Sequence, residues 1–162
     1  MVDQSGAASR WEGIPPEEAK AAAIAAFRDT TKPTNCAQAV MLFTLHLLGG
    51  RPELADVASY LGGGVGKTGG ACGVLTGAAL SLGIRDSLYA DASAARADEG
   101  CSQFQHLKEA FVAAFGDTEC RELTGCELDT TAGQDRFRDE GIREKQCVGY
   151  VDWMCDRLAD IL

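Results

Sequence analysis

Residues 61–83 read LGGGVGKTGGACGVLTGAALSLG, and the interpretation of the whole chain starts from them. Six glycines between residues 62 and 70 predict a loop that a chain with Cβ atoms could hardly follow. Residues 71–82 are then mostly small or apolar and contain no proline, which predicts a buried helix. Gly73 and Gly77 lie four residues apart, so one face of this helix lets another backbone approach closely. We therefore expect a glycine-rich loop that leads into a tightly packed central helix.

Cys72 stands where this loop meets the helix. A thiol in the first turn of a helix lies at the positive end of the helix dipole, which favours the thiolate. The plainer alternative is a cysteine that is simply buried, as free cysteines often are. The segment from Gly66 to Thr68 resembles the end of a phosphate-binding loop, but that motif requires a glycine where this chain has Leu61. We therefore do not predict nucleotide binding.

Composition limits the class of protein. A chain of 162 residues with 46% hydrophobic content favours one domain, which we place at residues 14–162 after a flexible polar tail at residues 1–13. A net charge of −9 argues against binding to nucleic acid or to anionic membranes. No apolar run reaches membrane-spanning length, and the first residues lack the apolar core of a signal peptide. We expect a cytoplasmic protein.

Apolar residues recur with helical spacing along the chain, and no segment alternates as a strand does. The fold class is therefore all-α, a compact bundle of about five or six helices. The expected helical segments are residues 16–28, 36–48, 52–61, 71–82, 107–115, 120–124 and 141–162, with residues 126–140 as a loop. Asn35 with Gln38 forms a capping box, and Thr118 is a candidate N-cap.

The helical spacing also predicts which side chains face inward. The expected buried faces are Ala21, Ile24 and Phe27; Cys36, Val40, Phe43 and Leu47; Leu107, Ala110, Phe111, Ala114 and Phe115; and Cys147, Val151, Met154, Leu158 and Ile161. Two of these faces carry a cysteine, so we expect the side chains of Cys36 and Cys147 to point inward.

Seven cysteines in a reducing compartment favour metal binding or redox chemistry over structural disulfides. Cys36, Cys72 and Cys120 each open a predicted helix, where the dipole favours a thiolate, and Cys147 faces inward from the last helix. Four inward thiolates on separate elements are what an iron–sulfur cluster or a soft metal requires. Two thiols brought close together would instead form a redox dithiol.

Three segments resemble a known family: NCAQAV at residues 35–40, CGVLTG at 72–77 and FVAAFGDTECRELTG at 111–125. With Cys147 they resemble the redox-active proteins named for the C_GCAxxG_C_C pattern, over about residues 17–155. The middle motif here reads Cys-Gly-Val, where the family name has Gly-Cys-Ala. The family is helical, and a related module occurs in split-Soret cytochromes c, which carry an iron–sulfur centre beside haem. The resemblance implies cluster binding and electron transfer.

The leading hypothesis is an electron-transfer or redox protein that binds an iron–sulfur cluster through four cysteines. We call these residues the pattern cysteines: Cys36, Cys72, Cys120 and Cys147. Cys126 is the expected substitute if Cys147 points elsewhere. The alternatives are a metal-free thiol oxidoreductase that uses Cys36 and Cys72, and a non-catalytic module stabilised by zinc.

The remaining cysteines and both histidines are assigned no chemistry. We expect Cys101, Cys126 and Cys155 to be structural or incidental, and His46 and His106 to be packing or surface residues. The expected partner is a redox protein, and a homodimer is an open alternative. Whether the protein is an oxidoreductase or an electron-transfer component is left open at this point.

Overall fold

The computed structural model describes residues 12–88 and 94–162, and this part of the chain is almost entirely helical. The elements in chain order are α1 (Pro16–Arg28), α2 (Cys36–Leu48), the 3₁₀ helix η1 (Pro52–Ala58), α3 (Gly73–Ser87), α4 (Ala94–Phe115), α5 (Cys120–Thr124), α6 (Thr131–Asp139), the π-helical turn η2 (Arg143–Cys147) and α7 (Val148–Ala159). The one sheet-like contact among the described residues is an isolated antiparallel bridge between Ala71 and Glu119. The expected all-α class is confirmed.

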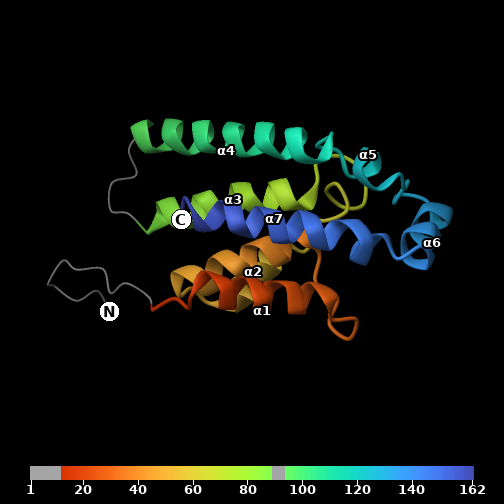
Figure 1. Ribbon diagram of the computed structural model, residues 1–162, viewed down its shortest axis with the longest axis horizontal. Coiled ribbons are helices and arrows are strands. Elements are labelled where there is room, and N and C mark those ends of the chain that lie inside the picture. The colour runs from red at the N-terminus through yellow and green to blue at the C-terminus, as the bar shows by residue number, and fades with distance from the viewer. Residues whose placement is uncertain (1–11, 89–93) are drawn as a thin grey trace, which may run out of the picture.

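The helices lie roughly along one long axis. Figure 1 shows α1 and α2 on one side, α3 and α7 in the middle and α4 on the other side. α2 packs against α1, η1, α3 and α7, so it is as central as the predicted glycine-led helix α3. Three segments gather at one end of the bundle: α5, α6 and the glycine-rich loop that precedes α3 (Figure 1). The C-terminus lies at the other end.

Asn35 both starts α2 and ties it to η1. Its side chain accepts a hydrogen bond from the Gln38 N–H, and the Gln38 side chain accepts one from the Asn35 N–H, so the predicted capping box is confirmed. The Asn35 amide also donates to the carbonyl oxygens of Ala58 and Ser59 at 3.0 and 2.8 Å. These bonds fix the first turn of α2, which begins at Cys36.

α2 and α3 cross at very short range. A Cβ atom on Gly77 would lie 2.9 Å from the Ala37 carbonyl oxygen and from Val40 Cβ, and one on Gly73 would overlap Cys36 Sγ. The predicted close approach at these two glycines is confirmed. The sulfur of Cys36 therefore sits directly against the first turn of α3.

Two predicted helix faces need correction. In α1, Ala21 is exposed, and the buried residues are Ala19, Ala23 and Phe27, because the stripe that packs on α2 and α7 repeats every four residues. In α4, Ala110 and Ala114 are exposed. The buried residues of α4 include Leu107 and Phe111, because this helix contacts the bundle along one narrow stripe.

The predicted loop at residues 126–140 is wrong, because it contains α6. Thr130 caps this helix by accepting a hydrogen bond from the Gly133 N–H at 3.0 Å. Gly133 is its one buried residue, so α6 has no apolar stripe that a periodicity search detects. Ion pairs of Arg136 with Glu140 and of Arg138 with Asp135 lie along its exposed surface.

Two further differences concern helix ends. α3 continues beyond the expected residue 82 to Ser87, and the predicted last helix divides into η2 and α7. α6 and the division of the last helix give more elements than the expected five or six. The predicted tail lies outside the described residues except for Glu12 and Gly13, as do residues 89–93 of the polar stretch after α3. No helix within the described ranges has both the length and the apolar character needed to cross a bilayer.

Candidate functional site

The structure brings the pattern cysteines to one end of the bundle. A cavity of about 550 Å³, here called the Cys36 cavity, is lined by Cys36, Cys120 and Cys147. Cys72 lies behind Cys36 with 4% of its surface exposed, and its thiol donates a hydrogen bond to Cys36 Sγ. The four residues come from α2, the start of α3, α5 and η2, so only the folded chain makes them neighbours.

Cys36 is the residue whose surroundings favour a thiolate. The Cys72 thiol contributes most, and the backbone N–H groups of Gly63, Cys36 and Ala37 add to it, while burial acts in the opposite direction. Together they lower the pKa of Cys36 to about 7. Cys36 is therefore substantially ionised near neutral pH, as expected for a thiol in the first turn of a helix.

The same expectation fails for Cys72 and Cys120. The hydrogen bond to Cys36, burial and the Cys36 charge raise the pKa of Cys72 far above its ordinary value. Burial, then the Cys36 charge, raises the pKa of Cys120 to about 11. Cys72 is only the N-cap of α3, and α5 has just five residues, so the helix dipole is weak at both positions. It is outweighed at Cys72 by the interaction with Cys36 and by burial, and at Cys120 by burial.

Cys147 is also a protonated thiol. Burial is the largest cause that raises its pKa, followed by the charges of Cys36 and Cys120, whereas the nearby Arg143 guanidinium lowers it. Cys147 ends the π-helical turn η2, and such turns often occur at functional sites. Since Cys147 lines the cavity, the Cys126 substitute is not needed to bring a fourth sulfur to this end of the bundle.

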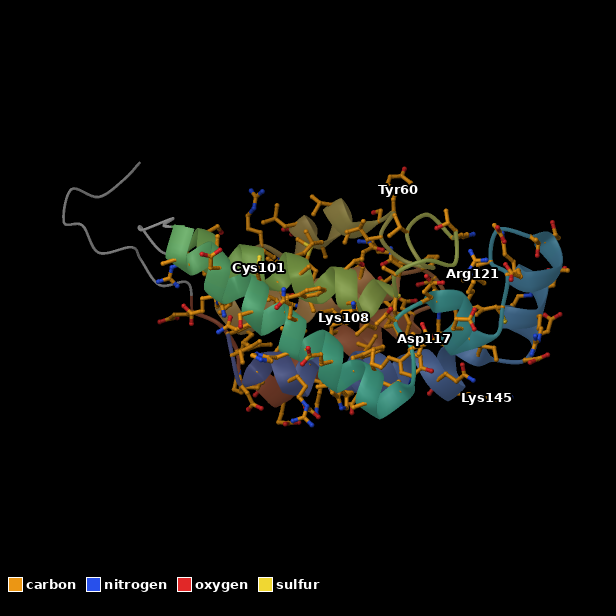
Figure 2. All side chains as sticks on the ribbon, turned by 90° about the horizontal axis from the view of Figure 1, so that it is seen from above. Tyr60, Cys101, Lys108, Asp117, Arg121 and Lys145 are labelled. Atoms are coloured by element: carbon orange, nitrogen blue, oxygen red, sulfur yellow. The ribbon has the colours of Figure 1, made fainter. Side chains whose placement is uncertain are left out.

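A short antiparallel pairing carries Cys120 to Cys72. The Cys72 N–H donates to the Thr118 carbonyl at 2.8 Å, and the Cys120 N–H donates to the Gly70 carbonyl at 2.7 Å. The Asp117 carboxylate accepts from the N–H groups of Thr118 and Glu119 and so shapes the turn after α4 (Figure 2). The predicted N-cap at Thr118 is wrong, because Glu119 occupies that position without a side-chain hydrogen bond.

The glycine-rich loop forms a left-handed turn. The five residues from Gly63 to Lys67 all have φ between 61° and 73°, and two of them, Val65 and Lys67, are not glycine. A left-handed conformation costs roughly 1–2 kcal/mol for a residue with a Cβ atom. Such strain tends to lie at functional sites, and this turn places the Gly63 N–H at Cys36 and Lys67 on the cavity wall.

The walls of the Cys36 cavity combine apolar and cationic side chains. Its apolar and aromatic lining residues are Phe27, Tyr60, Leu128 and Phe137, and its cationic ones are Lys67, Arg138 and Arg143. Tyr60 is 82% exposed and projects outward beside the glycine-rich loop (Figure 2). Sequence reasoning missed these residues, because they come from five separate segments and no local motif connects them.

The other cysteines lie away from the cavity surface. Cys126 is buried against Cys120, Leu128 and Ile142, and Cys155 is fully buried in the main core. Cys101 is exposed on α4, as Figure 2 shows. Neither His46 nor His106 lines the cavity. The structural or incidental roles expected for these residues stay predictions.

The side chains do not form a ready-made metal site. Across residues 12–88 and 94–162, no three Cys, His, Asp or Glu side chains are grouped so that they could hold a metal ion. Three pattern cysteines line one cavity and the fourth, Cys72, lies behind Cys36, yet all except Cys36 are thiols whose ionisation is unfavourable. Ligand roles for these residues therefore stay predictions, whereas the Cys36–Cys72 contact is present in the structure.

A family model described as "Putative redox-active protein (C_GCAxxG_C_C)" matches residues 34–161. The chain belongs to this family. The match contains all of the pattern cysteines and confirms the resemblance found in the sequence. No curated protein and no solved structure matches the chain. Membership places the chain in a family that is described by redox activity, and it leaves the cofactor open.

Proposed function

We propose that Cys36 and Cys72 form a redox dithiol that reduces a disulfide substrate. One observation supports the proposal above all: Cys36 lines an open cavity, and its sulfur lies directly against Gly73, the residue that follows the buried Cys72. The lowered pKa of Cys36 agrees with this arrangement. A thiolate is the form that attacks a disulfide, so Cys36 is the attacking residue and Cys72 the resolving one.

The exchange has two steps. The Cys36 thiolate attacks one substrate sulfur, the substrate S–S bond breaks, one half leaves as a thiolate, and the other half stays bound to Cys36. Cys72 then loses its proton and attacks Cys36 Sγ, forming the Cys36–Cys72 disulfide and releasing the second half as a thiolate. Two electrons pass from the protein dithiol to the substrate, and the Cys72 proton goes to solvent or to a released thiolate.

The raised pKa of Cys72 fits the second role. Its largest cause is the hydrogen bond to Cys36, and the charge of Cys36 is another. Both disappear when Cys36 becomes part of a mixed disulfide. Burial then remains as the main force against ionisation, so Cys72 becomes a better nucleophile only after the first step.

Turnover requires a reductant for the Cys36–Cys72 disulfide. We assign this role to a dithiol-bearing redox partner protein in the cytoplasm, where thiol reductants are available. The acidic chain, with net charge −9, suits docking onto a basic protein surface.

An iron–sulfur cluster bound by the pattern cysteines is the second candidate. It is favoured by the lining of one cavity by Cys36, Cys120 and Cys147, with Cys72 directly behind. Thiolate ligands are what such a cluster uses, and when bound it would supply one-electron transfer. In the part of the chain that the structure describes, the side chains are not grouped as a metal site.

Anaerobic purification with metal analysis separates the two candidates. For the dithiol we expect colourless protein that, after mild oxidation, loses two hydrogens and contains a Cys36–Cys72 disulfide by peptide mapping. Cys72→Ser should trap a mixed disulfide on Cys36, whereas Cys101→Ser should behave as the unmodified chain. A brown preparation that contains iron and sulfide, and bleaches on Cys→Ser exchange at each of the pattern cysteines, would overturn the dithiol and support the cluster.

A further inference from the structure

The Cys36 cavity is cationic in an acidic protein. Lys67, Arg138 and Arg143 line it, and none of its lining residues is Asp or Glu, although the chain carries a net charge of −9. A local excess of positive charge in a concave site attracts anions more strongly than the same charges would on an open surface.

Two of these cations are not committed to carboxylates. Arg143 donates to the Phe27 carbonyl at 2.9 Å and lies 4.7 Å from the centre of the Phe27 ring, so its guanidinium is held in place. Lys67 has a 3.5 Å hydrogen bond to the Gln134 amide oxygen. Within the described residues neither forms an ion pair, whereas Arg138 is paired with Asp135 and Asp139.

We propose that the Cys36 cavity binds a low-molecular-weight disulfide that carries carboxylates. Lys67 and Arg143 bind the carboxylates, and the S–S bond faces Cys36. The identity of the substrate rests on the proposed dithiol function, and the reaction is the two-step exchange given above. A cavity of about 550 Å³ suits a small molecule rather than a protein chain.

The remaining lining residues fit the rest of such a molecule. Phe27, Leu128 and Phe137 present apolar surface to its carbon atoms. The guanidinium of Arg143 can form two parallel hydrogen bonds with one carboxylate, and the Lys67 ammonium acts as a point charge for another. A cationic disulfide of the same size would meet repulsion from both groups.

The test compares two alkylating reagents that differ in charge, iodoacetate and iodoacetamide. In each reagent the thiolate attacks the carbon that carries iodine, and iodide leaves. The test therefore measures the attraction of an anion to Cys36 and requires no disulfide. The ratio of the two rates at Cys36, divided by the same ratio at the exposed Cys101, removes the intrinsic reactivity of the reagents. We expect this normalised ratio to favour iodoacetate by about fivefold, as for charges ~4 Å apart in water.

Variants assign the preference to the two cations. Lys67→Gln and Arg143→Gln should each lower the normalised ratio at Cys36, and Arg143→Lys should restore part of it. Lys108→Gln removes the same charge from α4, a helix that contributes no residue to the cavity lining, and should leave the ratio unchanged. If Arg143→Gln fails to fold, Lys67→Gln alone decides. A ratio at Cys36 equal to that at Cys101, or unchanged by Lys67→Gln, overturns the proposal.

Disulfide substrates then separate this proposal from the dithiol function. Reduced protein should react faster with dithiodiglycolate, which carries two carboxylates, than with the cationic cystamine. Added salt should reduce the difference between the two rates. Equal rates with both, together with a Cys36–Cys72 disulfide, overturn the anion preference and leave the dithiol standing. If Cys36 prefers iodoacetate but no Cys36–Cys72 disulfide forms, the dithiol function is rejected. The cavity then remains an anion-binding site, and a small-molecule disulfide is overturned as its ligand.

Discussion

Cys36 and Cys72 are the same residue type with opposite ionisation, and their surroundings explain the difference. Cys36 accepts the Cys72 thiol hydrogen bond and faces three backbone N–H groups, which stabilise its negative charge. Cys72 faces that charge and is almost fully buried, and the Val74 N–H, which favours its thiolate, does not offset these effects. In a thiol pair with unequal pKa values, the thiol with the lower pKa attacks the substrate first and the other resolves the mixed disulfide.

The substitution Cys72→Ala tests this arrangement. It removes the largest cause of the low Cys36 pKa, so the pKa should rise from about 7 toward the ordinary value of a thiol. Between pH 6 and 8 the Cys36 thiolate fraction should fall, and alkylation of Cys36 by iodoacetamide should slow. The pH dependence of that rate, followed by mass spectrometry, gives the midpoint.

Cys101→Ser is the control for this experiment, because Cys101 is exposed on α4 and does not line the cavity. Its midpoint for Cys36 should match that of the unmodified chain. A midpoint that stays near 7 in Cys72→Ala would show that the backbone N–H groups are sufficient and that the thiol pair is not needed.

At the scale of elements, the close contact of α2 and α3 holds Cys36 against the start of α3. Thr44 and Ser81 extend this contact with a buried hydrogen bond of 2.7 Å between their hydroxyl groups. At Gly77 the neighbouring atoms belong to the backbone and a β-branched side chain of α2, which cannot move aside cheaply. This close packing therefore fixes the position of α2 relative to α3 at the site.

Two glycines of α3 offer a matched comparison. Gly77→Ala places a methyl group 2.9 Å from the Ala37 carbonyl, and it should lower the free energy of unfolding by roughly 1–3 kcal/mol; Gly77→Leu should cost more. Gly83→Ala adds a methyl group in open space of the same helix, and it should stabilise the chain by roughly 0.5–1 kcal/mol. Urea denaturation of reduced protein measures both, and a destabilised Gly83→Ala or a neutral Gly77→Ala would contradict the described crossing.

At the scale of the whole molecule, α4 is attached by an aromatic cluster. Phe111 is fully buried, and its ring centre lies 5.8 Å from those of Tyr150 and Trp153 on α7. Phe115 packs against the same two rings at 4.7 and 5.6 Å. Because α4 leads into the segment that pairs with the glycine-rich loop, this attachment also positions Cys120.

Phe111→Ala should therefore affect both stability and the site. Removal of a buried phenyl ring should cost about 3–5 kcal/mol of unfolding free energy, and it should increase the rate at which Cys120 is alkylated. Val112→Ala is the control, because this neighbour is 37% exposed and its loss should cost little. Equal denaturation midpoints for the two variants would show that α4 does not depend on the aromatic cluster.

The amino-acid sequence alone predicts the features that depend on neighbours a few residues apart. Helical spacing predicts the all-α class, and Asn35 with Gln38 predicts the start of α2. Gly73 and Gly77 predict the close contact because side-chain volume can be read directly from the residue type. α6 escapes prediction because its residues, apart from Gly133, are not buried, so it leaves no apolar period.

Only the tertiary structure decides the chemistry of the site. Residues 69–72 and 118–121 pair across about fifty positions of sequence, and this pairing makes Cys72 and Cys120 neighbours. Helix position alone predicts a thiolate at Cys36, Cys72 and Cys120. Of these three, only Cys36 has a lowered pKa in the folded chain, because the interaction between Cys36 and Cys72 favours the thiolate at Cys36 and burial raises the pKa of Cys72 and Cys120. Ionisation depends on desolvation and on charges within a few ångströms, and both are set by which distant segments meet in the folded chain.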